Sequence, residues 1–173
     1  MDQICRYASP LGGITLAGDG EALVGLWFDG QKHFAAGLNG LTENEALPVF
    51  AQARRWLDAY FSGEAPDRTP PLRPRGTPFQ LAVWRLLTEI PYGQTVTYGA
   101  LAARLHRPGA AQSVGGAVGR NPLSLMIPCH RVVAADGGLT GYAGGLERKR
   151  WLLALEAGGQ ESLPPFFPPK SVK

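Results

Sequence analysis

The sequence predicts an α+β fold, in which a small α/β N-terminal domain precedes a C-terminal helical domain with a winged-helix-like helix-turn-helix. Three observations lead to this fold class. Apolar and β-branched runs come early in the chain, a proline-rich stretch follows one amphipathic segment, and short capped helical segments fill the second half. The length of 173 residues fits one ordinary domain or two small ones.

The N-terminal half begins with strands. Two apolar or β-branched runs, 14–17 and 22–28, flank the turn sequence 18–20 and predict a β-hairpin. An amphipathic helix is predicted over 50–61, and Gly63 ends it. The apolar stripe of this helix consists of Phe50, Ala53, Leu57 and Phe61.

A proline-rich stretch separates the two halves. Residues 64–78 contain five prolines and show no apolar periodicity, which predicts an extended linker. We therefore place the N-terminal domain at 1–65, the linker at 66–77 and the C-terminal domain at 78–159. The remaining residues, 160–173, are rich in proline and are expected to form a disordered tail.

Threonines mark the helix starts of the second half. Thr77 can cap a helix with Pro78 at its first position, and the sequence 91–93 breaks that helix. Thr97 can cap a second, shorter helix that runs through Leu105. Both helices are short, as expected of a compact helical domain.

A turn at 107–109 joins the second helix to a third one over 110–119, which Asn121 and Pro122 stop. Two short helices joined by a Gly-containing turn in a basic segment match a helix-turn-helix. The third helix consists mainly of alanine, serine and glycine. Such small residues permit close approach either of a partner or of a neighbouring helix, and the sequence leaves both interpretations open.

The chain then continues through an apolar run, a turn and a last helix. The mainly apolar residues 124–128 run into Cys129–Val133, and the turn is at 136–137. The last helix, around 148–156, lies between the Gly–Gly pairs 144–145 and 158–159.

Composition and charge narrow the class of protein. Hydrophobic residues make up 45% of the chain, which is enough for a real core. The formal net charge of +3 divides into −4 over 1–70 and +7 over 71–173. This split suggests that the second half faces an anionic partner, with chance in a short chain as the alternative.

The cysteine count and the apolar runs indicate the compartment. Cys5 and Cys129 form no disulfide framework, and no signal peptide or stretch of about 18 apolar residues occurs. We therefore expect a cytoplasmic protein with no membrane partner. We expect no metal, because neither cysteine pairs nor histidine pairs occur at zinc-ligand spacing.

Cys129, His130 and Glu156 are the polar residues best suited to act together. A thiol reacts as its thiolate, and an imidazole nearby can take the proton directly or through a water. A carboxylate on the far side of the imidazole would fix its tautomer. The alternative is an inert core cysteine, because free cysteines are often buried and unreactive.

The segment 127–133, Ile-Pro-Cys-His-Arg-Val-Val, resembles the active-site signature of the O6-alkylguanine-DNA alkyltransferases, also called methylated-DNA–protein-cysteine methyltransferases. The similarity covers roughly residues 76–157, and Ser9-Pro10-Leu11-Gly12 also resembles the start of the family, more loosely. The other matching segments, in order and with compatible spacing, are 90–98, 114–117, 121–122, 141–145 and 151–153.

The resemblance implies irreversible DNA repair. Family members bind duplex DNA through the helix-turn-helix and flip the damaged guanine out of the stack, at a cost of a few kcal/mol. Cys129 would accept the alkyl group, His130 would take the thiol proton through water, and Glu156 would orient His130. The thioether is stable, so neither turnover nor a cofactor is expected. The implied partner is double-stranded DNA containing O6-alkylguanine, bound by a monomer, and O4-alkylthymine is left open as a second substrate.

Further roles follow from the same resemblance. Tyr98 would donate a proton or hydrogen bond to the departing guanine, and Asn121 would tie the recognition helix to the active-site loop. Tyr142, Val132 and Ala143 would bind the base. Ordinary half-buried aromatics and a helix stop are the alternatives for the two tyrosines and the asparagine. The implied DNA-binding residues are Ala110, Ala111, Gln112, Ser113 and Gly115.

The sequence departs from the family pattern at two positions. Gln112 replaces the usual arginine, which occupies the space left by the flipped base, so we hypothesise weaker flipping in duplex DNA. Ala143 replaces a serine that some relatives use to bond the guanine oxygen. Arg131 is expected to be structural and to lie outside the pocket.

Other functions compete with repair. A lesion-binding relative without chemistry is disfavoured because Cys129 is present. A helix-turn-helix regulator would footprint a specific sequence and show no thiol labelling, and a Cys-His-Glu hydrolase would turn over a thioester or peptide. Mass spectrometry after treatment with an alkylated guanine separates these functions.

Overall fold

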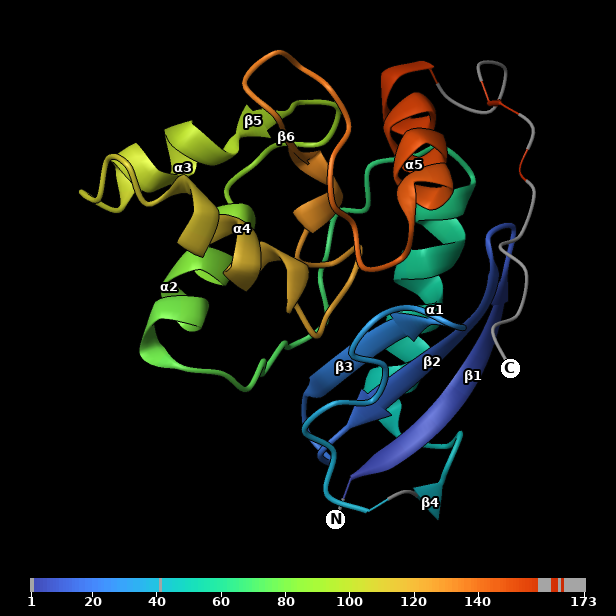
Figure 1. The fold of residues 1–173 in the computed structure, drawn as a ribbon. Coiled ribbons are helices and arrows are strands. Elements are labelled where there is room, and N and C mark those ends of the chain that lie inside the picture. The colour runs from blue at the N-terminus through green and yellow to red at the C-terminus, as the bar shows by residue number, and fades with distance from the viewer. Residues whose placement is uncertain (1, 41, 159–162, 165, 167–173) are drawn as a thin grey trace.

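The structure is a computed structural model that describes residues 2–40, 42–158, 163–164 and 166. A twisted sheet with one helix packed on it forms one part of the molecule, and a group of short helices forms the other (Figure 1). The predicted α+β fold class is confirmed. None of the described helices is both long enough and apolar enough to cross a membrane.

The N-terminal sheet has the strand order β3-β2-β1-β4. Strands β1, β2 and β3 pair antiparallel, which confirms the predicted hairpin, while the short β4 pairs parallel with β1. The sequence analysis did not predict β1 or β4. The strand bounds are Gln3–Ser9 for β1, Gly12–Gly18 for β2, Leu23–Phe28 for β3 and Thr42–Glu43 for β4.

Helix α1 (Pro48–Phe61) is the predicted amphipathic helix and covers one face of this sheet (Figure 1). The predicted stripe is buried, and so are Trp56 and Tyr60 on the same side of the helix. Pro48 suits the first helical turn, because the missing N–H would have no partner inside the helix. The apolar side of α1 therefore faces the sheet and, further along, the C-terminal half.

The extended stretch before the second half is attached to the edge of the sheet. The amide of Leu23 donates to the carbonyl of Pro71 at 2.8 Å, and the amide of Arg73 donates back to the carbonyl of Leu23 at 2.7 Å. Arg75 forms an ion pair with the buried Asp2 at 2.7 Å. One apolar core runs through both halves of the chain, and the domain boundaries stay a prediction.

The C-terminal half consists of short helices, and its predicted caps are confirmed. Thr77 and Gln80 form a reciprocal capping box, with distances of 3.0 and 3.1 Å, and the hydroxyl of Thr97 accepts from the amide of Ala100 at 3.0 Å. The helix bounds are Pro78–Leu87 for α2, Tyr98–Arg104 for α3, Ala111–Gly119 for α4 and Leu146–Gly158 for α5.

Helices α3 and α4 pack against each other as the predicted helix-turn-helix (Figure 1). Next to them a two-stranded parallel sheet joins β5 (Val96–Thr97) to β6 (Val132–Val133), which the sequence analysis did not predict. This pairing connects the start of α3 to the residues that follow Cys129. It therefore positions the helix-turn-helix against the segment that contains Cys129.

Helix α4 has one buried side and one exposed side. Val114, Ala117 and Val118 are buried, whereas Gln112 and Gly116 are exposed. A Cβ atom built at Gly116 meets nothing within 4 Å, so internal packing does not require this glycine. This supports the interpretation that the small residues on the exposed side allow a partner to approach closely.

Most of the expected disordered tail, 160–173, lies outside the described residues. Among its described residues, Leu163 and Phe166 pack against the main core. The guanidinium of Arg148 lies 5.9 Å from the centre of the Phe166 ring. At these two positions the chain follows the surface of the folded part.

Candidate active site

Cys129 begins a one-turn 3-10 helix, Cys129–Arg131, that leads into β6. The residue is buried, with 5% of its surface exposed. Burial raises the pKa of the Cys129 thiol to about 11, although the Asn121 side chain and the Lys149 ammonium each lower it. The thiol is therefore protonated at neutral pH, and a base must remove the proton before the sulfur can act as a nucleophile.

The neighbouring His130 is fully buried and paired with Glu156 from α5. The Nε2 atom of His130 lies 2.6 Å from Oε2 of Glu156, so Nε2 carries the hydrogen and donates it to the carboxylate. Nδ1 then has a free lone pair, and no described residue donates a hydrogen bond to it. Burial lowers the pKa of His130 against the opposing effect of Glu156, which keeps the imidazole neutral and able to accept a proton.

Glu156 is held by several donors. Burial alone would raise its pKa, but hydrogen bonds from His130 and Arg131 hold the pKa well below its usual value. Arg131 Nε donates to Oε1 at 2.7 Å, and the amide of Gly93 donates to the same oxygen at 3.1 Å. Tyr60 Oη donates to Oε2 at 2.6 Å. The carboxylate is therefore a fixed anion within the core.

Arg131 has a structural position, as the sequence analysis expected. Besides Glu156, its guanidinium bonds the carbonyl of Ile90 at 2.7 Å and lies 5.7 Å from the centre of the Tyr92 ring. It therefore joins the active-site turn to α5 and to the loop after α2.

Asn121 cross-links the end of α4 to the active-site segment. Its Nδ2 atom donates to the carbonyl of Ile127 at 2.7 Å, and its Oδ1 accepts from the amide of Leu123 at 3.0 Å. Asn121 therefore connects the end of α4 to the residues immediately before Cys129. This contact geometry is more than a helix stop requires.

Two further predicted residues, Tyr98 and Tyr142, interact electrostatically with Cys129. Tyr98, at the start of α3, donates to the carbonyl of Thr140 at 3.3 Å, and the Tyr142 side chain is buried. Burial raises the pKa of both phenols, and the Cys129 charge raises them further. Each therefore remains a hydrogen-bond donor near the sulfur at neutral pH.

The remaining predicted residues are divided between the core and the surface. Val132 is fully buried on β6, and Ala143 is half-buried in the loop before α5. On and beside α4, Gln112 and Ser113 are exposed. The half-buried residues there are Ala110, Ala111 and Gly115.

Sequence reasoning missed Tyr60 and Lys149. Lys149 is fully buried, its Nζ donates to the carbonyl of Thr140 at 2.7 Å, and it interacts electrostatically with Cys129. Lys149 precedes Glu156 by seven residues, so helical periodicity could have placed both on one face of α5. Tyr60 lies in the other half of the chain, and no local pattern connects it to the site.

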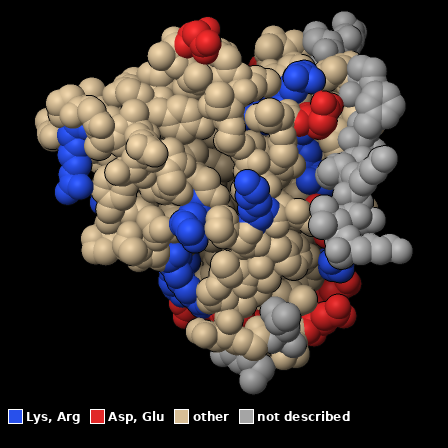
Figure 2. Space-filling view, in the orientation of Figure 1, with Lys and Arg blue, Asp and Glu red and all other residues tan. Residues whose placement is uncertain are grey.

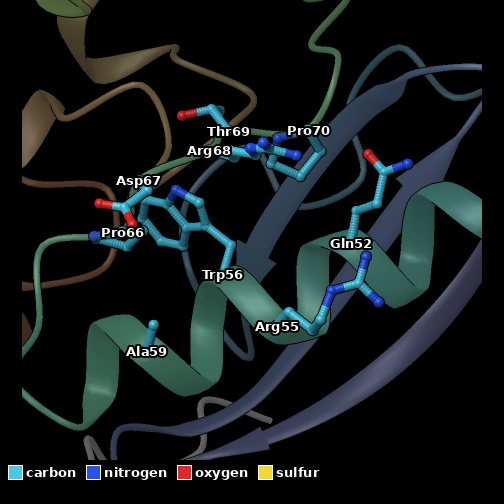
Figure 3. Close-up of a pocket in the computed structure, with 9 residues that line it drawn as sticks. All are labelled: Gln52, Arg55, Trp56, Ala59, Pro66, Asp67, Arg68, Thr69 and Pro70. Carbon is cyan, nitrogen blue, oxygen red and sulfur yellow. The ribbon is translucent and has the colours of Figure 1, made fainter.

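A separate hollow of about 520 Å³ lies between α1 and the segment 66–70 (Figure 3). Trp56 projects from α1 and forms part of the wall of the hollow, and Arg55 and Arg68 lie at the edges of the hollow. None of the residues that line it belongs to the Cys129 site. Among the described residues no group of three His, Cys, Asp or Glu side chains could hold a metal ion.

The fold and the site together define a helix-turn-helix protein with a buried cysteine that is followed by a histidine hydrogen-bonded to a buried glutamate. Two family models match nearly the whole of this fold. The 6-O-methylguanine DNA methyltransferase DNA binding domain matches residues 78–158, and the ribonuclease-like domain of the same family matches 6–74. The chain belongs to the 6-O-methylguanine DNA methyltransferase family, so the resemblance is confirmed.

Individual relatives support the same family assignment. A methylated-DNA–protein-cysteine methyltransferase of Haemophilus influenzae is 44% identical over 168 residues, which is 93% of each chain. One of Methanosarcina acetivorans is 47% identical over 150 residues, 87% of this chain and 95% of the relative. The crystal structure of Mycobacterium tuberculosis OGT in complex with DNA matches with a TM-score of 0.82 and 43% identity, covering 91% of this chain and 94% of that one.

Proposed function

We propose that this protein repairs DNA by moving the alkyl group of O6-alkylguanine onto Cys129 in one irreversible step. The observation that carries this proposal is the buried Cys129 thiol beside the His130–Glu156 pair, whose Nε2–Oε2 distance is 2.6 Å. The relatives named methylated-DNA–protein-cysteine methyltransferase support the reaction. The DNA complex of the M. tuberculosis protein supports duplex DNA as the partner.

The reaction needs a single displacement. The Cys129 proton moves to Nδ1 of His130, directly or through a water, and the resulting imidazolium is stabilised by Glu156. The sulfur then attacks the alkyl carbon. An S–C bond forms, the C–O6 bond breaks, and its electron pair stays on the guanine. The departing guanine takes a proton from the Tyr98 hydroxyl, and the thioether remains on the protein.

The base reaches the site by flipping, because the O6 atom of a stacked guanine is inaccessible to a buried thiol. The exposed side of α4, including Gln112 and Gly116, would lie against the DNA. Tyr142, Val132 and Ala143 would line the base pocket, and Asn121 would couple α4 to that pocket. Gln112 offers no cation to the DNA stack, so flipping depends on the remaining contacts.

The positive charge of the second half supports binding to the phosphate backbone. On the face shown in Figure 2, Lys and Arg form separate groups rather than one continuous patch. Scattered charge of this kind suits weak, sequence-independent scanning. The expected monomeric state and cytoplasmic location stay predictions.

Intact-protein mass spectrometry tests the function. The wild-type chain is treated with O6-benzylguanine and, separately, with duplex DNA carrying O6-methylguanine. We expect one alkyl group per chain, located on Cys129, and none in Cys129→Ser. Cys5→Ser is the matched control, because Cys5 is also buried and free and should not react. Continued release of product, or an adduct on Cys5, would refute the proposal.

A further inference from the structure

Tyr60 brings a hydroxyl from the N-terminal half into the centre of the active site. It lies on α1, its side chain is fully buried, and its Oη donates to Oε2 of Glu156 at 2.6 Å. The same Oη lies 3.4 Å from Nε2 of His130. One oxygen therefore contacts both members of the pair that deprotonates Cys129.

The ring of Tyr60 is fixed by its aromatic neighbours. It stacks on Trp56, with centroids 5.2 Å apart and planes 5° apart, and meets Phe61 and Tyr92 edge-on. Trp56 also lines the hollow in Figure 3. These contacts use the ring and would be made equally well by phenylalanine. Apolar packing therefore accounts for the ring and leaves the buried hydroxyl to be explained.

The hydroxyl acts on the His130–Glu156 pair in two ways. Because the Tyr60 proton points to Glu156, the Oη lone pairs are available to Nε2 of His130. Nε2 then faces two acceptors, which favours the tautomer with hydrogen on Nε2 and a free lone pair on Nδ1. In addition, the Tyr60 hydroxyl shares the negative charge of Oε2 with two other donors, His130 Nε2 and, at 3.2 Å, Arg131 Nη2, so the carboxylate attracts a proton onto the imidazole less strongly.

Other charged and titratable groups act on the same pair and must stay unchanged in a test. Arg131 faces the carboxylate from the active-site turn, and Tyr92 faces it from the loop after α2. The remaining groups, from the 3-10 helix, α5 and the loop before α5, are Cys129, Lys149 and Tyr142.

We propose that Tyr60 is a positioning residue for alkyl transfer: its hydroxyl holds Glu156 in place and keeps His130 neutral, with Nδ1 free, until the thiol proton arrives. This inference rests on the proposed function. The N-terminal half then contributes to the active site, because α1 supplies the hydroxyl that sets the protonation state and tautomer of His130.

Tyr60→Phe tests the proposal, with the single-turnover rate of alkylation by O6-benzylguanine measured as a function of pH. The free base avoids any contribution from DNA binding. With one donor fewer on Oε2, the pKa of His130 rises, and the acid limb of the profile moves to higher pH by about one unit. The rate falls about tenfold below that limb and little above it. Tyr7→Phe is the matched control, because Tyr7 donates to Asp58 at 2.6 Å away from the site.

Site-specific 3-fluorotyrosine at position 60 gives a second measurement that preserves the ring and the hydroxyl. The fluorinated phenol is a stronger donor, so the acid limb should move to lower pH, opposite to the shift in Tyr60→Phe. Imidazole ¹⁵N NMR of His130 should follow both shifts. A purely structural hydroxyl predicts no such pair of opposite shifts.

The outcomes separate this inference from the function on which it rests. If the wild-type chain forms no adduct on Cys129, the proposed function fails. If the wild-type chain reacts and both Tyr60 variants follow its pH profile, the inference about Tyr60 alone is overturned. Opposite shifts in the two variants, with an unshifted Tyr7→Phe, support it.

Discussion

Replacing Gly116 with alanine should make the protein more stable and a poorer binder of DNA. Gly116 lies in the interior of α4 on its exposed side, and a Cβ atom there meets nothing within 4 Å. The folded structure therefore accepts the methyl group without strain. Glycine costs about 1 kcal/mol relative to alanine in a helix, so Gly116→Ala should gain up to about that amount. For a chain of this size, this corresponds to a melting temperature higher by about 2–4 °C.

The same methyl group would stand between α4 and a duplex that approaches this side. We expect the affinity for undamaged duplex DNA to fall by about three- to tenfold, or about 0.7–1.4 kcal/mol. Thermal unfolding followed by circular dichroism gives the melting temperature. Fluorescence anisotropy with a labelled duplex at fixed salt gives the DNA affinity. Gly99→Ala on α3 is the control, because its Cβ also meets open space. That variant should keep DNA affinity within about twofold of the wild type.

Two results would count against this reasoning. A Gly116→Ala protein that binds DNA as tightly as the wild type would show that the exposed side of α4 does not face the duplex closely. A variant that is less stable would show that the space around Gly116 is filled in solution. In either case the small residues of α4 would need another explanation.

Three further predictions concern single side chains. Gln112→Arg should speed repair of duplex O6-methylguanine and leave the rate with free O6-benzylguanine unchanged, as measured by single-turnover kinetics. Glu156→Gln should slow alkylation by about 10²–10⁴-fold and lower thermal stability, because it leaves the Arg131 charge buried without its anion. Asp2→Asn should cost about 1–2 kcal/mol at pH 7 in urea unfolding. The hydrogen bond from Arg75 lowers the Asp2 pKa from 3.8 to about 2, so this contribution is present above pH 3.8 and disappears towards pH 2.

The parts of the fold that sequence reasoning predicted are encoded by neighbouring residues. The hairpin before Phe28, the capping box at Thr77 and the cap at Thr97 each depend on residues within a few positions of one another. The missed parts depend on distant residues. Val96 pairs with Val132 in strands of two residues each, which are too short to show a periodicity.

The site shows the same division. Cys129 and His130 are adjacent in the sequence, and the family signature connected them to Glu156. The hydrogen bond from Tyr60 joins residues 96 positions apart, and the amide of Gly93 joins the site through backbone geometry that no side chain indicates. Such contacts exist only after α1 and α5 have packed on the same core.

The burial of Cys129 also affects how long the thiol survives unmodified before the protein meets a lesion. With its pKa raised to about 11, the thiol is almost entirely protonated at pH 7, and the Cys129 residue is 5% exposed. Oxidants and stray electrophiles attack thiolates, so the waiting molecule offers them very little. We therefore expect unreacted chains to be lost mainly through alkyl transfer and only slowly through oxidation. Each alkylated chain then corresponds to one repaired base, because the thioether is stable.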